Sequence, residues 1–340
     1  MTRIIVFHQD SLSCEPILRR MPNNELICIC QCGGTSEPAP ENRVYVFHST
    51  DNGEHWTEPV SIYPENGKAV YCTEVFVLNN VIHAFLTTHS GHFLDWECIL
   101  MISRDNGYTW ENSGPPPHFP SFTFIRGMIT LKNSNILIPY QFYPVIKEAN
   151  DRVFKEKGAE GRVEHCNVPY VENGVLISSD SGNSYDRFPA VRFDMEDWIW
   201  SEPTIAELSN GTVTMLLRKC GSGYLWRSNS TDGGKTWSEA VKTDIPNPTN
   251  KPKLIAIPDG RIALIHTPNN KGIETARYVH RYPLQIWISD DNMNTFRYQK
   301  TMTEDPGNYS YADGFYENGH ILFTIEKNRK EILFIDHIIE

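Results

Sequence analysis

Apolar segments that alternate with tight turns recur along the whole chain. Runs rich in Ile, Leu, Val and Phe are interrupted by Asn-Gly, Asp-Gly or Asn-Asn pairs, as in residues 202–215 and 251–264. Turns of this kind between β-forming segments are the strongest short-range signal of a β-hairpin. The pattern therefore predicts an all-β protein built from hairpins.

Six hairpins can be aligned on their turns. They are predicted at residues 15–28, 74–85, 126–138, 202–215, 251–264 and 311–323. Six hairpins imply a six-bladed β-propeller, in which each blade is a four-stranded antiparallel sheet around a central axis. Little chain follows the last hairpin, so we expect an N-terminal strand at residues 2–8 to complete the last blade and close the ring.

A polar eight-residue phrase recurs five times between the hairpins. It reads Ser-x-Asp-x-Gly-x-x-aromatic, and its copies begin at Ser49, Ser103, Ser178, Ser230 and, in a degenerate form, Ser289. The Asp can accept backbone N–H groups, the Gly can take a positive φ angle, and the aromatic ring can anchor the turn. A phrase repeated at long intervals indicates a repeat architecture.

The chain is interpreted as a single propeller domain that spans residues 1–340. The longest interval between phrases lies between Trp110 and Ser178, and its excess falls at about 143–170, where Lys, Glu, Asp and Arg are frequent. This insertion is either a solvated loop or a lid or wall of a binding site.

The charge of the chain bears on its partners. The formal net charge is −11, from 42 acidic and 31 basic residues, which argues against a nucleic-acid partner bound through a basic face. A local basic pocket is still compatible with it. No apolar run approaches the length of a membrane span. The first ten residues lack the apolar core of a secretion signal, so we expect a cytoplasmic protein, or a secreted or periplasmic one if a signal peptide has been removed.

The eight cysteines do not suggest a metal site. Cys28, Cys30 and Cys32 alternate, so they share one face of a strand and cannot easily pair with one another. No CxxC motif or His-rich partner accompanies them. We predict buried free thiols and expect neither a metal nor another cofactor, and the oligomeric state stays open.

Two rings of polar residues are predicted on one face of the disc. The start of the first strand and the end of the second strand of each hairpin lie on that face. The first ring is formed by Glu15, Cys72, Arg126, Glu202, Lys251 and either Tyr309 or Tyr311. The second is formed by Gln31, Thr87, Gln141, Arg218, Thr267 and Glu326. Polar residues that converge near an axis predict a ligand pocket, to which the loops on this face add Glu37, Glu41 and His89.

The repeated phrase resembles the Asp-box of the sialidase superfamily, in which it is structural. Residues 202–218 resemble the sialidase segment that carries a catalytic glutamate and a substrate-binding arginine, at Glu202 and Arg218. The segment that begins at Arg281 resembles the one that carries another substrate arginine. Residues 308–311 resemble the segment of the nucleophilic tyrosine, with Tyr309 the better match, and Glu326 matches a glutamate that orients an arginine.

Two parts of the sialidase pattern are missing. The first arginine of sialidases lies in an Arg-Ile-Pro segment, and the matching residues here are Cys14, Glu15 and Pro16. The acid/base aspartate of the first blade has no clear match among residues 35–43, which offer only Glu37 and Glu41. The layout is more similar to the broad sialidase-like group of bacterial proteins with BNR repeats.

The resemblance implies a glycoside hydrolase that acts on an acidic or substituted sugar. Tyr309 would be the nucleophile and Glu202 its base, and arginines would hold a sugar carboxylate through bidentate hydrogen bonds. The predicted substrate-binding residues are Arg218, Arg281, Arg126, Glu15, Gln31, Lys251, Glu326 and Tyr311.

Two alternatives stay open. A polysaccharide lyase would neutralise a uronate carboxylate with Arg126, Arg218 and Arg281, and would move the adjacent proton with His89 or Tyr309. A non-catalytic propeller would bind an acidic oligosaccharide or another glycan in the same pocket without turning it over.

Overall fold

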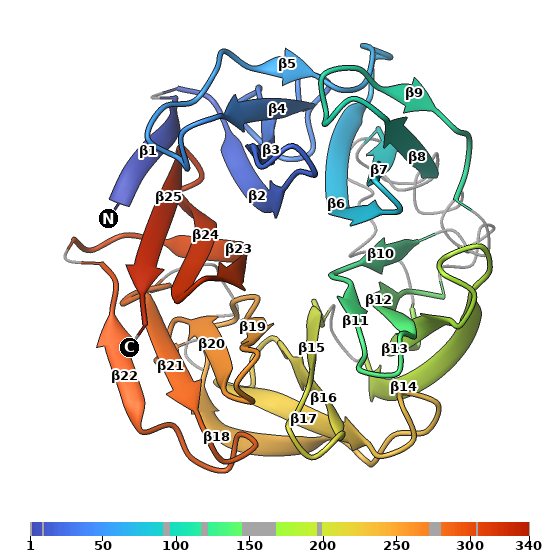
Figure 1. The fold of residues 1–340 in the computed structure, drawn as a ribbon, viewed down its shortest axis with the longest axis vertical. Coiled ribbons are helices and arrows are strands. Elements are labelled where there is room, and N and C mark those ends of the chain that lie inside the picture. Colours follow the sequence, from blue (N-terminus) through green and yellow to red (C-terminus); the bar gives the residue numbers. More distant parts are fainter. Residues whose placement is uncertain are drawn as a thin grey trace.

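The structure is a computed structural model, and it describes residues 2–8, 10–90, 96–116, 122–144, 168–195, 199–271, 280–303 and 305–339. Within these ranges, 25 strands form six antiparallel sheets. Figure 1 shows the sheets as the blades of one ring, each with its first strand nearest the axis. The six-bladed β-propeller predicted from the sequence is confirmed.

The first three blades follow one another along the chain. Blade 1 contains β2 (Ser13–Arg20), β3 (Leu26–Cys32), β4 (Arg43–Ser49) and β5 (Val60–Ser61). Blade 2 contains β6 (Ala69–Leu78), β7 (Val81–His89), β8 (Glu97–Ser103) and β9 (Glu111–Asn112). The inner strand of blade 3 is split into β10 (Thr123–Ile125) and β11 (Ile129–Thr130), which precede β12 (Ile136–Phe142), β13 (Tyr170–Ser178) and β14 (Asp186–Asp194).

The other three blades complete the circle. Blade 4 contains β15 (Pro203–Glu207), β16 (Val213–Leu217), β17 (Tyr224–Ser230) and β18 (Val241–Pro246). Blade 5 contains β19 (Lys253–Ala256), β20 (Ile262–His266), β21 (Gln285–Ser289) and β22 (Tyr298–Thr301). Blade 6 contains β23 (Tyr309–Glu317), β24 (His320–Lys327), β25 (Glu331–Ile338) and β1 (Thr2–Phe7).

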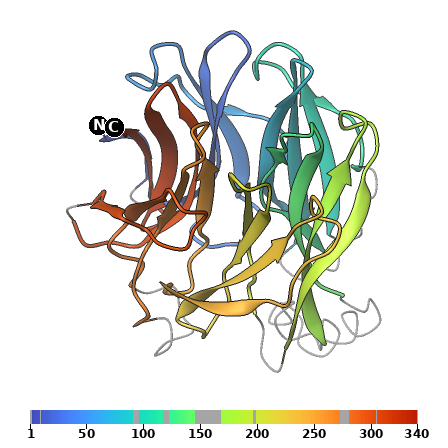
Figure 2. The ribbon, with the colours of Figure 1, turned by 60° about the horizontal axis from the view of Figure 1, so that its bottom comes forward.

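The N-terminal strand closes the ring as predicted. β1 pairs antiparallel with β25, from Thr2 opposite Ile335 to Phe7 opposite Glu331. The pairing gives β25 a partner along its outer edge, which would otherwise be an unpaired template for aggregation. In the tilted view of Figure 2 the sheets stand side by side around the ring, with their strands running through the thickness of the disc.

Each repeated phrase forms a turn after the third strand of a blade. In the first copy the Ser49 hydroxyl donates to Asp51 and the same Asp51 oxygen accepts the His55 N–H, both at 2.9 Å. The N–H of Gly53 donates to the Ser49 oxygen at 2.8 Å. The same bonds recur in the other four copies, which begin at Ser103, Ser178, Ser230 and Ser289. The phrase is therefore a structural turn at the hairpin end of blades 1 to 5.

Apolar side chains fill the spaces between neighbouring blades. One cluster contains Leu137 and Val175 of blade 3 together with Met215 of blade 4. Another contains Ile27 of blade 1 and Ile82 of blade 2, both almost fully buried. Burial of this surface is the main favourable contribution to the stability of the ring.

Buried charges meet where the inner strands of four blades approach the axis. Arg19 of β2 forms ion pairs with Glu74 of β6 and Asp313 of β23. Lys253 of β19 contacts the other oxygen of Asp313. Burial would raise the pKa of Asp313, but the charges of Arg19 and Lys253 lower it well below its usual range. These contacts link blades 1, 2, 5 and 6, and we call the four residues the axial network.

Most of the predicted insertion at residues 143–170 lies outside the described residues. The seven cysteines of the described ranges are free, and Cys28, Cys30 and Cys32 are buried in β3, as predicted. The described part of the chain contains no helix that is long and apolar enough to cross a membrane.

We expect Gly53→Ala to destabilise the protein more than Gly107→Ala. The two glycines occupy the same position of the repeated phrase, at φ angles of 88° and 95°, where an alanine costs about 1 kcal/mol. A methyl group at Gly53 would also collide with the ring of Phe334, whereas at Gly107 the nearest atom belongs to His48, 3.4 Å away. Overpacking adds roughly 1–3 kcal/mol. Urea denaturation measures both losses, and equal losses would contradict this packing.

Candidate functional site

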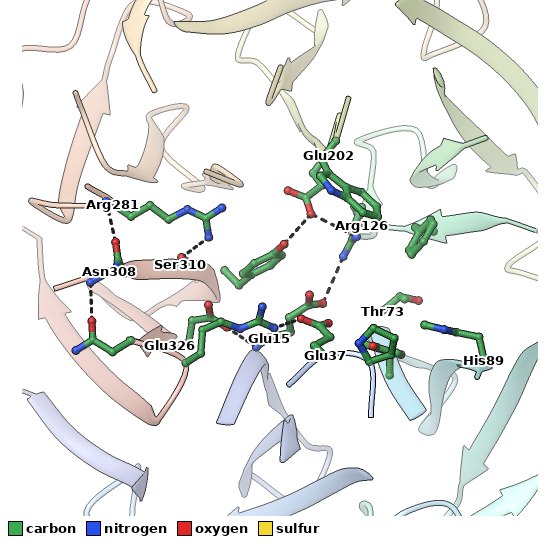
Figure 3. Close-up of a pocket in the computed structure, with 17 residues that line it drawn as sticks. Glu15, Glu37, Thr73, His89, Arg126, Glu202, Arg281, Asn308, Ser310 and Glu326 are labelled. Carbon is green, nitrogen blue, oxygen red and sulfur yellow. Dashed lines mark hydrogen bonds and ion pairs between the residues drawn. The ribbon is translucent and has the colours of Figure 1, made fainter. Parts of the chain in front are cut away.

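A cavity of about 410 Å³ opens at the axis of the propeller, on the face where the inner strands begin. Figure 3 shows side chains from several blades converging on it. Of the residues predicted from the sequence, those that line it are Glu15, Glu37, His89, Arg126, Glu202, Arg281, Tyr311 and Glu326. The predicted ligand pocket is thus present as a cavity.

Irregularities in the inner strands aim side chains into this cavity. The pairing register shifts between Cys14 and Ile17 in β2, and between Ser310 and Asp313 in β23. Glu15 and Tyr311 lie inside these bulges with φ angles of 50° and 55°. A positive φ is strained for a non-glycine residue and unusual for a bulky one. β-Bulges commonly re-aim a side chain beside a functional site.

Glu202 lies at the centre of the hydrogen-bonded groups. Its Oε1 accepts the hydroxyl of Tyr311 at 3.0 Å and lies 3.4 Å from Arg126 Nη2. Its Oε2 accepts Nη1 of Arg218 at 2.5 Å. Burial would raise the pKa of Glu202, but the charges of Arg218 and Arg126 lower it to about 2. Glu202 is therefore an ionised hydrogen-bond acceptor at neutral pH.

Arg126 connects Glu202 with a second carboxylate. Its Nη1 lies 3.6 Å from Oε2 of Glu15, and Figure 3 shows the guanidinium between the two acids. Its Nε donates to Gln141 at 3.3 Å, and Gln141 in turn donates to the hydroxyl of Tyr143 at 2.9 Å. Arg126 follows β10, where the break in the inner strand of blade 3 turns it toward the axis.

Glu15 differs from Glu202 in its charge environment. Burial, together with the charge of Glu37, raises the pKa of Glu15 to about 7, and Arg126 opposes this rise. The backbone N–H of Glu15 donates to Oε2 of Glu326 at 2.9 Å. Burial also raises the pKa of Glu326. Two carboxyl groups with pKa values pushed apart in one cavity are typical of acid–base sites.

Cations from blades 5 and 6 line the opposite side of the cavity. Arg281 donates from Nη1 to Ser310 at 2.6 Å and from Nη2 to the Thr249 carbonyl at 2.8 Å. Figure 3 shows Arg281 and Ser310 on the side away from His89 and Thr73. Arg329 forms an ion pair with Glu37. This side is suited to polar or charged groups of a ligand.

Aromatic rings form the other wall. His89 is almost fully buried and lies between two rings, with centroid distances of 5.0 Å to Tyr71 and 5.4 Å to Trp96. Phe124 and Trp200 also line the cavity, and their rings pack edge to face at 6.1 Å. Rings of this kind can contact the apolar face or an apolar substituent of a sugar.

The predicted pairing of Tyr309 with Glu202 is wrong. Tyr309 packs in the apolar cluster between blades 5 and 6, and its hydroxyl donates to the Asp305 carbonyl at 3.2 Å. Tyr311, two residues further along β23, makes the bond to Glu202. The bulge that begins at Ser310 gives Tyr311 its positive φ and directs its side chain, rather than that of Tyr309, toward the cavity.

Three predicted substrate-binding residues do not line the cavity. Arg218 is fully buried behind Glu202, and Gln31 is buried beside Cys14, whose thiol lies 3.8 Å from its side-chain oxygen. Lys251 is half-buried, with its ammonium 5.9 Å from the centre of the Tyr311 ring. Arg218 thus contacts Glu202 and Lys251 lies near the Tyr311 ring, but neither lines the cavity.

Sequence reasoning missed several lining residues. Arg329, for example, belongs to the loop between β24 and β25. Loops between the second and third strands open on the pocket face, so topology alone could have pointed to Arg329. Nothing local in the sequence singles out Tyr71 or Phe124. In the described ranges, no three His, Cys, Asp or Glu side chains are grouped so as to hold a metal ion.

The sequence matches a protein-family model over most of its length. A model described as a BNR repeat-like domain matches residues 24–322. The chain belongs to this family. A search of curated proteins found no match.

Solved structures share the fold of this BNR repeat-like protein. A protein of unknown function from Dyadobacter fermentans has a TM-score of 0.74 at 18% identity, over 100% of this chain and 98% of its own. The Hadza microbial sialidase Hz136 has a TM-score of 0.72 at 18% identity, over 96% of this chain and 66% of its own. For Trypanosoma rangeli sialidase the TM-score is 0.66 at 18% identity, over 96% of this chain and 55% of its own. The chain therefore spans about two thirds of the length of the Hadza sialidase and about half of the length of the Trypanosoma rangeli sialidase.

We expect Glu202→Ala to destabilise the protein by about 3–5 kcal/mol, because removing one partner leaves the buried charge of Arg218 uncompensated. The double variant Glu202→Leu with Arg218→Met removes both charges and should recover much of this loss. Urea denaturation gives the free energy of unfolding of each variant. A double variant less stable than Glu202→Ala would contradict the importance of this pair.

Proposed function

We propose that this protein is a glycoside hydrolase that acts on an acidic or substituted sugar. The observation that carries the proposal is the 3.0 Å hydrogen bond from the Tyr311 hydroxyl to Glu202, at a cavity on the axis of the propeller. Sialidases use a tyrosine nucleophile in place of a carboxylate. Several solved structures with this fold are sialidases, which supports a role on glycans.

The environment of Tyr311 suits a nucleophile that is activated only during the reaction. Burial, reinforced by the charges of Glu202 and Glu15, raises the pKa of Tyr311 well above its ordinary value. The hydroxyl is therefore protonated in the resting protein and points its proton at Glu202. As Tyr311 attacks the anomeric carbon, this proton can pass to Glu202, which Arg126 and Arg218 hold in place.

Arg281 is the best candidate to bind a carboxylate of the sugar. Its guanidinium lines the cavity, and hydrogen bonds to Ser310 and the Thr249 carbonyl fix its orientation. Burial and the nearby charge of Arg218 lower the pKa of Arg281. An anionic ligand would offset both effects, and a guanidinium can offer it two parallel N–H donors.

The neighbouring sialidases illustrate the reaction class. Trypanosoma rangeli sialidase has been solved with 2,3-difluorosialic acid as a covalent intermediate and with the inhibitor DANA. Its likeness to this chain, at 17% identity, supports the class of reaction. Glu15 stands where sialidases have their first arginine, so this site offers one positive charge fewer to a carboxylate. This favours an acidic sugar other than sialic acid.

Replacement of Tyr311 tests the proposal. We expect Tyr311→Phe to lower turnover roughly 10³-fold or more, as loss of a nucleophile does, while glycan binding persists. Tyr309→Phe is the matched control, and it should retain most of the activity because its hydroxyl lies outside the cavity. The measurement is turnover of a panel of 4-methylumbelliferyl glycosides of sialic, glucuronic and iduronic acids and of acidic oligosaccharides.

The products separate the alternatives. A free reducing sugar indicates hydrolysis, whereas an unsaturated uronate would indicate a polysaccharide lyase. Binding without turnover would indicate a glycan-binding propeller. Unchanged turnover by Tyr311→Phe would contradict the role of this tyrosine.

A further inference from the structure

Two carboxyl groups of blade 1, those of Glu15 and Glu37, line the cavity beside the Tyr311 and Glu202 pair. Glu37, from the loop after β3, forms an ion pair with Arg329. Glu15, at the start of β2, lies 3.6 Å from Arg126, which is closer to Glu202 at 3.4 Å. Glu37 therefore forms a direct ion pair with Arg329, whereas Glu15 shares the guanidinium of Arg126 with Glu202.

The backbone around Glu15 is built to hold one geometry. Glu15 and Tyr311 are the two non-glycine residues of the described ranges that have a positive φ inside a strand. The strain at Glu15 is held by the hydrogen bond from its N–H to Glu326, a carboxylate that is 1% exposed. Strained residues persist where the surrounding structure fixes them, and they cluster at functional sites. A β-bulge with a positive φ thus directs both Glu15 and Tyr311 into one cavity from adjacent blades.

The charges around Glu15 allow its carboxyl to exist in both protonation states near neutral pH. The groups that face it are Glu37, Arg126, Glu202, Arg329, Glu326 and Tyr311. Burial and the charges of Glu37 and Glu202 raise the pKa of Glu15 to about 7, against the effect of Arg126 and Arg329. A group that donates and then accepts a proton works best when its pKa is close to the working pH.

We propose that Glu15 is the acid/base residue of the hydrolysis, an inference that rests on the proposed function. In the first step the Tyr311 oxygen bonds to the anomeric carbon, and the bond from that carbon to the leaving oxygen breaks. The Tyr311 proton passes to Glu202, and the Glu15 proton passes to the leaving oxygen. In the second step a water oxygen replaces Tyr311 on the carbon, Glu15 takes the water proton, and Glu202 returns its proton to Tyr311.

Arg126 couples the two proton transfers. It contacts both carboxyl groups, so it can shift its stabilisation from one to the other as their charges change. When Glu202 gains a proton in the first step, Glu15 loses one. The negative charge is therefore on Glu15 instead of Glu202, and the Arg126 guanidinium contacts both positions. This exchange keeps the net charge of the cavity constant, which limits the electrostatic cost in a poorly solvated site.

The kinetic test compares Glu15→Gln with Glu37→Gln, two matched replacements of carboxylates in the same cavity. The substrates are the 4-methylumbelliferyl glycoside, which leaves easily, and the alkyl glycoside of the same sugar, which needs protonation. We expect Glu15→Gln to lose roughly 10²–10⁴-fold in kcat/KM on the alkyl glycoside, the usual contribution of a general acid. It should lose far less in kcat/KM on the aryl glycoside, because this parameter reports the bond-cleavage step. It should also lose the basic limb of the pH profile. Glu37→Gln should affect both substrates alike.

A second measurement does not require a substrate. The carboxyl of Glu15 can be followed by ¹³C NMR titration of the whole protein, with Glu15→Gln used to assign its resonance. The expected pKa is about 7, and a pKa at or below the usual glutamate value of about 4.3 would overturn the inference.

The outcomes distinguish this inference from the proposed function. If the wild-type protein hydrolyses both glycosides and Glu15→Gln loses kcat/KM equally on the two, the role of Glu15 is overturned and the proposed hydrolase stands. A selective loss for Glu37→Gln instead would assign the role to Glu37 and overturn it as well. Failure of the wild-type protein to hydrolyse any member of the panel would overturn the proposed hydrolase, and the role of Glu15 with it.

Discussion

Several charges buried near the axis find their partners on other blades, and this requirement constrains how the ring closes. Arg19 pairs with Glu74 and Asp313 in the axial network, and Arg126 contacts Glu15 and Glu202 above it. A buried carboxylate or guanidinium that loses its partner costs several kcal/mol. Apolar packing between blades supplies most of the stability, while the charges select the arrangement in which each one is neutralised.

The same pairing gives the carboxyl groups different chemistry. Glu202 has two arginines and stays ionised, whereas Glu15 shares one arginine and lies near other acids, so its pKa rises to about 7. Bulges in β2 and β23 aim Glu15 and Tyr311 at the cavity, and Glu326 holds the first bulge. A base, an acid and a hydroxyl therefore converge because the ring closes, without any of them being neighbours in sequence.

The blade architecture could be predicted because its signals are local. Turn pairs such as Asn79 and Asn80 predict the hairpins. The Ser-x-Asp-x-Gly phrase predicts the turn that follows the third strand of a blade. The pair Glu202 and Arg218 was found because both residues flank one hairpin. Tyr311 could not be distinguished from Tyr309, because the bulge between them depends on how blade 6 meets its neighbours. The rest of the aromatic wall likewise could not be predicted, because tertiary packing decides that Tyr71 and Phe124 face the cavity.

Trapping the covalent sugar adduct tests the role of Tyr311 most directly. The wild-type protein would be incubated with 2,3-difluorosialic acid or with the fluorinated glycosyl fluoride of whichever acidic sugar it hydrolyses. Peptide mapping by mass spectrometry then locates the added mass. We predict a label on Tyr311 that is absent from Tyr311→Phe and present in Tyr309→Phe. A label on Tyr309, or on a carboxylate such as Glu15, would contradict a nucleophile made from Tyr311 and Glu202.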